Sequence, residues 1–220
     1  MPSDRFQESY RVGNPYDLAE QIGEDGIAKL LALVCEAYNM LCNHKIVKLG
    51  MSEDEITEEL FKEIQIVWRA STIPQTIIPI NQKIDKTLAK NIGKPPAIDF
   101  CFRDRWVKEA FFGFECKLLA EGNVRLYKEY VENGLFRYLQ GKYCAKGSAG
   151  SLIGYVNSGR ISVIVQDVKT RVDKESILTA MVKASSISAF EEHYVSTHSR
   201  EGGLSSFCVH HLFFCFSALN

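Results

Sequence analysis

The sequence has no run of eighteen or more apolar residues, which is the length that a helix needs to span a membrane. Residues 1–16 are polar, with Asp4, Arg5 and Glu8 among them, and they do not contain the apolar segment of a secretory signal. We therefore expect a cytoplasmic protein that has no membrane partner.

Cysteine spacing typical of zinc sites is also missing, because the sequence has no CxxC pair and no Cys/His cluster. The number of cysteines is odd, and most of them lie in hydrophobic surroundings: Cys35, Cys42, Cys101, Cys116, Cys144, Cys208 and Cys215. This pattern predicts buried free thiols.

Neither sign of charge is in excess, since 26 basic and 27 acidic residues give a net charge of −1. The overall charge therefore gives no argument for a polyanionic partner. Locally the charge is uneven: residues 83–108 contain seven basic and three acidic residues, whereas residues 51–65 contain six acidic residues and only Lys62 as a base. The basic segment is either a nucleic-acid contact or an ordinary solvated surface.

Signatures that read nucleic acid or bind nucleotides are absent too. There is no helix-turn-helix, zinc finger or RNA-recognition pattern. The Gly/Ser run at 147–151 lacks the Lys-Ser/Thr ending of a phosphate-binding loop, so we expect a plain loop there.

The length of 220 residues and the hydrophobic content of 46% predict a single domain over residues 1–220, with a helical N-terminal segment of about 1–50. Apolar residues at helical spacing predict a helix over 17–43. A second helix is expected from Ser52 to about Trp68, because Ser52 and Glu55 form a capping box and Ile56, Leu60, Ile64 and Val67 form its buried stripe.

Two short segments, 98–102 and 113–119, are rich in aromatic and aliphatic residues and predict neighbouring strands. Before them, Pro74 and Pro79 predict an irregular stretch, followed by a short amphipathic helix over 84–92. After them, apolar spacing predicts a helix over 124–140.

In the last third, we expect a loop with a short helix over 141–159, a strand over 161–165, a helix over 173–195 and a strand over 207–216. The resulting order of elements predicts the α/β class, with a small mixed β-sheet flanked by helices.

Two carboxylates and an ammonium are expected to converge on the strand pair. Because strand side chains alternate between faces, Glu115 and Lys117 share one face, and Asp99 interrupts the apolar neighbours on the preceding strand. Asp99, Glu115 and the carbonyl of Cys116 supply oxygen ligands of the kind that Mg²⁺ prefers. Lys117 is placed to orient or activate the attacking water and to offset charge on a phosphate.

This pattern resembles the PD-(D/E)XK nuclease family, whose signature is an Asp at the end of one strand and Glu-x-Lys on the next. The resemblance covers residues 53 to about 145 and implies a restriction-endonuclease-like core. It implies catalytic roles for Asp99, Glu115 and Lys117, with Asp99, Glu115 and the Cys116 carbonyl as metal ligands. Here the proline is not adjacent to Asp99, which departs from the family pattern.

Many family members add a Glu from a preceding core helix, and Glu53 is the candidate for this catalytic and metal-binding role because it falls in the middle of the apolar stripe of its helix. Glu53 can equally be a first-turn acid that complements the helix dipole. The helix after the Glu-x-Lys strand, with Tyr143 beyond it, resembles the element that supports the site or touches phosphate. The expected nucleic-acid contacts are Lys94, Arg103, Arg105, Lys128 and Arg137.

The resemblance implies a Mg²⁺- or Mn²⁺-dependent nuclease that cuts DNA in preference to RNA and serves in bacterial anti-phage defence or restriction. The small size and the near-neutral charge predict a homodimer or a chain that acts with a partner subunit, since an isolated protein that binds a DNA groove needs more positive surface. Two alternatives stay open: a catalytically inactive nuclease-like subunit and a protein-interaction module without metal.

Histidine-based catalysis is not expected. His210 and His211 are adjacent on an expected strand and therefore face opposite ways. His193 and His198 are expected on the surface of the late helix. Trp106, beside Arg105 and Lys108, either packs at a rim or stacks on a base.

Overall fold

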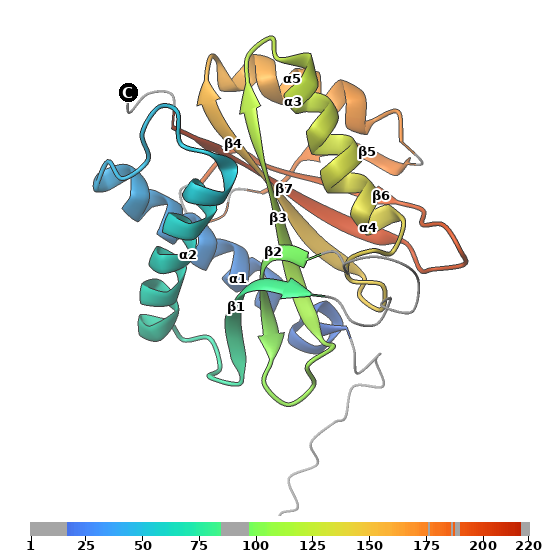
Figure 1. The fold of residues 1–220 in the computed structure, drawn as a ribbon. Helices are drawn as coiled ribbons and strands as arrows, with labels where there is room; N and C mark the ends of the chain where they lie inside the picture. The colour runs from blue at the N-terminus through green and yellow to red at the C-terminus, as the bar shows by residue number, and fades with distance from the viewer. Residues whose placement is uncertain (1–16, 85–96, 176, 186, 188–189, 217–220) are drawn as a thin grey trace, which may run out of the picture.

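The computed structural model describes residues 17–84, 97–175, 177–185, 187 and 190–216. Its strands form one mixed seven-stranded sheet with helices on both faces (Figure 1). The elements are α1 (Leu18–Asn43), α2 (Glu53–Ala70), β1 (Ile77–Ile84), β2 (Ala97–Asp104), β3 (Phe111–Ala120), α3 (Val124–Glu129), the π-helical segment η2 (Tyr130–Leu135), α4 (Phe136–Leu139), β4 (Ala149–Ser158), α5 (Ile161–Val172), β5 (Ile177–Lys183), β6 (His193–His198) and β7 (Phe207–Cys215).

The strand order is β1-β2-β3-β4-β7-β6-β5. The three strands at each end of the sheet pair in antiparallel fashion, whereas β3 with β4 and β4 with β7 are parallel. A parallel pair needs a crossover connection between its strands. The helical stretch from α3 to α4 lies in the connection from β3 to β4, and α5 lies in the connection from β4 to β7. The expected α/β class with a mixed sheet flanked by helices is confirmed, although the sheet has more strands than expected.

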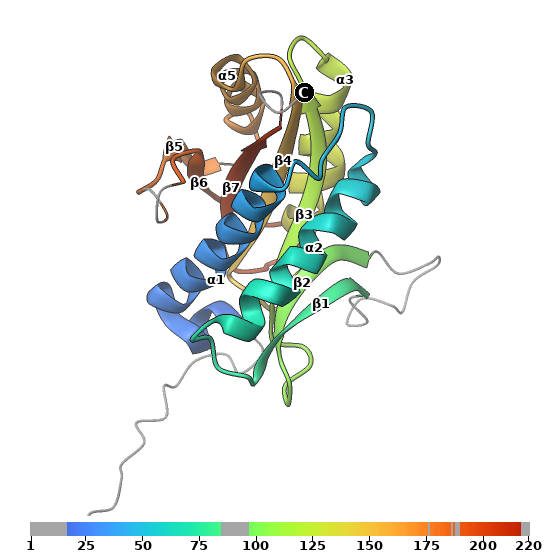
Figure 2. The same cartoon turned by 90° about the vertical axis from the view of Figure 1, so that its left-hand side faces the viewer.

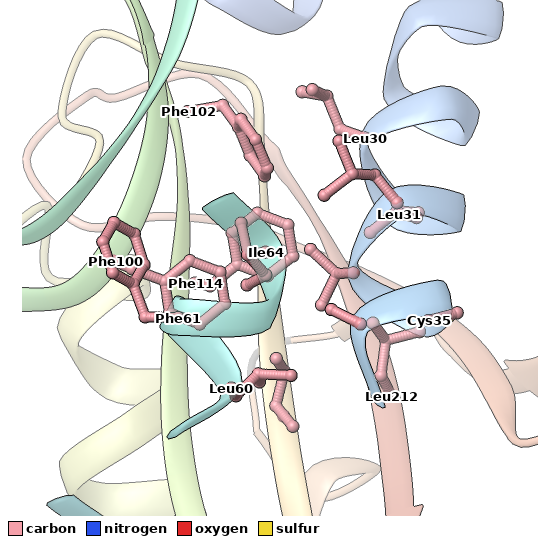
Figure 3. Packing of buried hydrophobic residues seen from close by; sticks show 14 of the residues in the cluster. Leu30, Leu31, Cys35, Leu60, Phe61, Ile64, Phe100, Phe102, Phe114 and Leu212 are labelled. Atoms are coloured by element: carbon pink, nitrogen blue, oxygen red, sulfur yellow. The ribbon is translucent and has the colours of Figure 1, made fainter. Parts of the chain in front are cut away.

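Two hydrophobic cores lie on opposite faces of the sheet. The first joins α1 and α2 to the strands, and Figure 3 shows Phe100, Phe114, Phe61 and Ile64 gathered there. The rings of Phe100 and Phe114 stack at 4.7 Å on adjacent strands, a geometry that adds about 0.5–1.5 kcal/mol to their burial. The second core lies on the other face of the sheet, which α3, η2, α4 and α5 cover. Both faces of the central strands are thus covered.

The two N-terminal helices form as the sequence predicts. The side chain of Ser52 accepts from the amide of Glu55, and Glu55 in turn accepts from the amide of Ser52, so the capping box is complete. The predicted stripe of α2 is buried. In α1, Gly23 has φ 69°, a conformation open to glycine, and it kinks the helix near its start. Figure 2 shows both helices on the same side of the sheet.

Four predictions about the rest of the chain are wrong. Residues 77–84 form β1 in spite of Pro79, because β1 is an edge strand where a proline costs no ladder bond on the outer side. Residues 149–158 form β4 rather than a loop and helix. Residues 161–165 begin helix α5 rather than a strand, and the expected helix over 173–195 is replaced by β5 and the start of β6.

Other predictions have mixed outcomes. The helix over 124–140 is present, with a π-helical middle, and the strands at 98–102, 113–119 and 207–216 are confirmed. The expected helix over 84–92 lies outside the described residues, apart from Ile84, which ends β1. All seven cysteines are described and none is in a disulfide; four are buried, whereas Cys42, Cys208 and Cys215 are half-buried. In the described part of the chain, no helix is long and apolar enough to cross a membrane.

Candidate active site

The site lies where strands β2 and β3 separate. Their antiparallel register runs from Arg103 opposite Phe111 to Phe100 opposite Phe114 and ends there. Strand β3 continues to Ala120 and pairs on its other side with β4. Beyond Phe114, the edge of β3 that faced β2 is therefore left without a strand partner among the described residues.

Two carboxylates take the place of the missing strand. The amide of Cys116 donates to Oδ2 of Asp99 over 2.6 Å, and the amide of Leu118 donates to Oε2 of Glu53 over 3.0 Å. Asp99 comes from β2 and Glu53 from the first turn of α2. Hydrogen bonds from amides to ionised carboxylates are stronger than those between neutral groups, so this edge of β3 is well satisfied.

Lys117 lies at the centre of this arrangement. Its Nζ is 2.8 Å from Oε1 of Glu53 and 2.9 Å from Oε1 of Glu115, and it also donates to the carbonyl of Cys116. Lys117 is 8% exposed and Glu115 is 1% exposed. The ammonium is thus surrounded by three oxygen atoms in a region that little water reaches.

A second cation reaches Glu115 from α4. Nη1 of Arg137 lies 3.0 Å from Oε1 of Glu115 and also donates to the hydroxyl of Tyr143. The Tyr143 hydroxyl donates in turn to the carbonyl of Ala97 at the start of β2 over 2.8 Å. Arg137 and Tyr143 therefore link the helix that follows β3 to both strands of the site.

The surroundings shift the pKa values of both strand carboxylates upward. Burial raises the pKa of Asp99 to about 6, against the opposing effect of Lys117 and the amide of Cys116. Burial and the nearby charge of Asp99 raise the pKa of Glu115 to about 7, although Lys117 and Arg137 act in the opposite direction. Two buried carboxylates that repel each other favour a proton or a metal cation between them.

Lys117 keeps its proton. Burial alone would lower its pKa, but the carboxylates of Glu115, Glu53 and Asp99 outweigh burial and raise the pKa above the ordinary value for lysine. At neutral pH the group is an ammonium that donates hydrogen bonds.

The donor set fits a hard divalent cation. Oε2 of Glu115 is buried and has no hydrogen-bond partner in the described part of the chain. The carbonyl of Cys116 and the carboxylate of Asp99 lie at the same fork. The described residues contain no group of three or more His, Cys, Asp or Glu arranged to hold a metal ion. Asp99, Glu115 and the Cys116 carbonyl are the groups that could hold a cation here, with water in the remaining positions. Both oxygens of Glu53, the fourth expected ligand, instead accept hydrogen bonds from Lys117 and from the Leu118 amide.

The structure brings together Asp99, Glu115, Cys116, Lys117 and Glu53, as the sequence predicts. Glu53 lies at the N-terminal end of α2 with 29% of its side chain exposed, so it is at the edge of the buried stripe rather than in its middle.

The expected nucleic-acid contacts are scattered by comparison. Arg137 belongs to the site itself. Arg105 is exposed beyond the end of β2, and Lys128 of α3 pairs with Glu132 of η2. Arg103 is half-buried, and its Nε has no hydrogen-bond partner in the described residues. Lys94 lies outside the described residues.

Sequence reasoning missed the support behind Cys116. The hydroxyl of Tyr155 lies 3.2 Å from Sγ of Cys116 and 3.1 Å from Oγ1 of Thr57, which donates to the carbonyl of Glu53. Tyr155 belongs to β4, which the Gly/Ser-rich sequence did not indicate as a strand. The signal in the sequence is the apolar run of Leu152, Ile153, Tyr155 and Val156, which is typical of a strand that is covered on both faces.

The histidine prediction is wrong in part. His193 and His198 are buried in β6 and are not surface groups on a helix. His210 and His211 do face opposite sides of the sheet: His210 lies against Phe112 in the first core and His211 against Tyr130 in the second. None of them reaches the fork between β2 and β3 through a contact that the structure describes.

No family model, curated protein or solved structure matches the chain.

Proposed function

We propose that this protein is a Mg²⁺- or Mn²⁺-dependent nuclease of the PD-(D/E)XK type, with a restriction-endonuclease-like core. The observation that carries the proposal is the meeting of Asp99, Glu115, the Cys116 carbonyl and Lys117 at one fork between two strands. Chance alternation of Glu and Lys on a strand would leave these groups in water, and here Glu115 and Lys117 are buried.

The order of elements supports the same proposal. Helix α2 precedes the strands and supplies Glu53, β2 carries Asp99, β3 carries Glu115 and Lys117, and the helical stretch from α3 to α4 follows with Arg137. Each residue is thus provided by the element that the family resemblance implies.

The residues divide the chemistry between them. Asp99, Glu115 and the Cys116 carbonyl would hold the cation. When bound, such a cation polarises the phosphoryl oxygen and lowers the pKa of the attacking water. Glu53 fixes the position of Lys117 and of the Leu118 amide. Arg137 offsets the charge of Glu115 while its partner Tyr143 holds it against β2.

Lys117 acts as a charged donor in this proposal. Because its pKa is raised by the surrounding carboxylates, it does not accept a proton from water at neutral pH. It orients the attacking water and offsets the negative charge that develops on the phosphate. The favoured substrate is DNA, cut by a homodimer or by this chain with a partner subunit, in bacterial anti-phage defence or restriction.

A second candidate function is a catalytically inactive nuclease-like subunit. It is favoured by the two cations, Lys117 and Arg137, that already neutralise Oε1 of Glu115. In such a subunit the buried ion pairs would serve the fold alone.

The test is incubation of the purified chain with supercoiled plasmid, linear DNA and RNA in Mg²⁺, Mn²⁺ or EDTA. We expect cleavage of DNA that EDTA abolishes and that Asp99→Asn and Glu115→Gln lower by roughly a hundredfold or more. Glu58→Gln is the matched control, because Glu58 is 66% exposed on the same helix as Glu53. This control should cut at the wild-type rate.

Calorimetry with Mn²⁺ separates the two candidates. Binding that Glu115→Gln abolishes, together with cleavage, supports the nuclease. Mn²⁺ binding without cleavage of DNA or RNA refutes the nuclease and supports the inactive subunit. Absence of both binding and cleavage refutes the nuclease and leaves the interaction module without metal.

A further inference from the structure

A cavity of about 990 Å³ lies between the first half of α1 and the strands β6 and β7. The hollow opens to solvent beside Glu20, Asp25 and Lys29 of α1, so it is a surface pocket and not an interior void. Its volume lies within the range of small-molecule sites. It is separate from the fork that holds Asp99 and Glu115, since none of the residues of that fork lines it.

Small side chains create the space. Helix α1 faces the cavity with Ala19, Ala28 and Ala32, and Ser148 and Ala149 line it at the start of β4. Larger residues at these positions would fill it. The alternation of the strands places His193, Val195 and Thr197 of β6, and Cys208 and His210 of β7, on this side of the sheet. Figure 2 shows α1 on the side of the sheet to which these residues point.

The hydrogen bonds fix the tautomers of the two cavity histidines. Nδ1 of His193 lies 3.2 Å from the carbonyl of Ser185, which can only accept, so Nδ1 carries the proton. Burial lowers the pKa of His193, and burial and then His193 lower that of His210 to about 4, so both rings are neutral at physiological pH. Nε2 of His193 is therefore the acceptor for Nδ1 of His210 at 3.1 Å.

It follows that Nε2 of His210 carries no proton and accepts hydrogen bonds. The nearest described partner is Sγ of Cys208 at 3.9 Å, and a thiol is a weak donor. A ligand with an N–H or O–H group would make a stronger bond to this nitrogen.

The charges around the cavity define the ligand further. Its charged lining residues, Glu20, Asp25 and Lys29, are exposed on α1, and no Asp, Glu, Lys or Arg lines it from the strands. A charged ligand would find no counter-ion beside His210. The walls are mostly apolar and also carry the hydroxyls of Ser148, Ser185, Thr197 and Ser206. An uncharged ring system matches such walls, and Nε2 of His210 is an acceptor whose described partner is only the weak donor of Cys208.

We propose that this cavity binds an uncharged aromatic or heteroaromatic small molecule that donates one hydrogen bond to Nε2 of His210. The site does not depend on the nuclease proposal. The cavity lies beside β7 and β6, toward the end of the sheet opposite to β1, so the proposed binding activity is separate from the fork between β2 and β3.

The experiment compares indole with 1-methylindole, which has the same ring but no N–H. Saturation-transfer NMR titrations on the full chain give both affinities. We expect indole to bind wild type roughly tenfold more tightly, since one neutral hydrogen bond separates the two probes. In His210→Phe, which keeps the ring volume, the two probes should bind equally.

Two variants on α1 test the location. Ala28→Trp fills the cavity from an exposed helix position and should weaken both probes at least tenfold, whereas Asn39→Trp, on the same helix and outside the cavity, should leave both unchanged. Thermal unfolding confirms that each variant is folded. The two probes on the wild type carry the test even if His210→Phe does not fold.

Three results would overturn the proposal: no binding of either probe to wild type, equal affinities of the two probes for wild type, or unchanged binding in Ala28→Trp.

Discussion

Glu53 and Lys117 are 64 residues apart in the sequence and form an ion pair 2.8 Å long between helix α2 and strand β3. The other oxygen of Glu53 accepts from the amide of Leu118, so one carboxylate binds both the side chain and the backbone of β3. The pair therefore joins the N-terminal end of α2 to strand β3 at the point where β2 and β3 separate.

We expect Lys117→Met to destabilise the fold by about 3–5 kcal/mol, because it leaves Glu115 buried with only Arg137 as a cation. Urea unfolding at pH 8 measures the loss. Lys62→Met is the control: Lys62 also pairs with two glutamates but is 53% exposed, and its loss should cost less than about 1 kcal/mol. Equal losses in the two variants would contradict the central role of Lys117.

The carboxyls of Asp99 and Glu115 should lower the stability of the metal-free protein as the pH rises from about 4.5 to about 7. Their folded-state pKa values of about 6 and about 7 lie above their ordinary values of 3.8 and 4.5, so both carboxyls bind more protons in the folded chain than in the unfolded chain in this window. Each unit of upward pKa shift is worth about 1.4 kcal/mol. The buried histidines, whose pKa values are lowered, act in the opposite direction over the same range. The difference between the urea midpoints of Glu115→Gln and the wild type in EDTA, from pH 4 to pH 8, isolates the effect of the carboxyl.

The midpoint of Glu115→Gln relative to that of the wild type should rise between pH 5 and pH 8, since the amide does not titrate. Mn²⁺ should raise the urea midpoint of the wild type at pH 8 more than at pH 5, because protons compete with the metal for the same oxygens. A difference between the midpoints of Glu115→Gln and the wild type that stays constant from pH 5 to pH 8 in EDTA would show that Glu115 is ionised without cost.

The candidate site was predictable because its residues lie on elements with clear periodicity. The capping box at Ser52 marks the start of α2, and the aromatic alternation around Phe100 and Phe114 marks β2 and β3. Once these three elements are placed, the faces of Asp99, Glu115 and Lys117 follow from the strand period. Arg137 and Tyr143 were predicted to lie near the site, but their hydrogen bonds to Glu115 and Ala97 depend on how α4 packs.

The C-terminal half was less predictable because tertiary contacts outweigh local propensity there. The β-branched run 161–165 indicates a strand, yet Ile164, Val165 and Val168 pack into the second core as one face of α5. Strand β4 is buried, and its glycines are required by close neighbours: a Cβ at Gly150 would come within 2.9 Å of the Tyr138 ring. Such contacts come from residues distant in sequence.

Trp106 should contribute to nucleic-acid binding and not to stability. It is 76% exposed in the turn between β2 and β3, where the side chain of Asp104 accepts from the amides of Trp106 and Val107, both over 2.7 Å. An exposed ring on a hydrogen-bonded turn, beside Arg105, suits stacking on a base. Trp106→Ala should weaken single-stranded DNA binding by about 1–3 kcal/mol in a fluorescence anisotropy titration.

The control for this variant is Leu49→Ala, which removes another exposed apolar side chain at a position distant from Trp106 in the sequence. Both variants should unfold at the wild-type urea concentration. Equal DNA affinities for Trp106→Ala and wild type would remove the turn from the binding surface.

Arg137→Met should shift the pH dependence of Mn²⁺ binding to higher pH. The guanidinium lies 3.0 Å from Glu115 and lowers the pKa of that carboxyl against the effect of burial. Without it, Glu115 holds its proton to a higher pH, and the metal must compete with that proton over a wider range. Calorimetric titrations with Mn²⁺ from pH 6 to pH 9 locate the midpoint.

Lys128→Met, which removes a side chain that is 63% exposed on α3, should leave the midpoint unchanged. A midpoint that stays in place or moves to lower pH in Arg137→Met would mean that Glu115 is not the group whose ionisation limits metal binding.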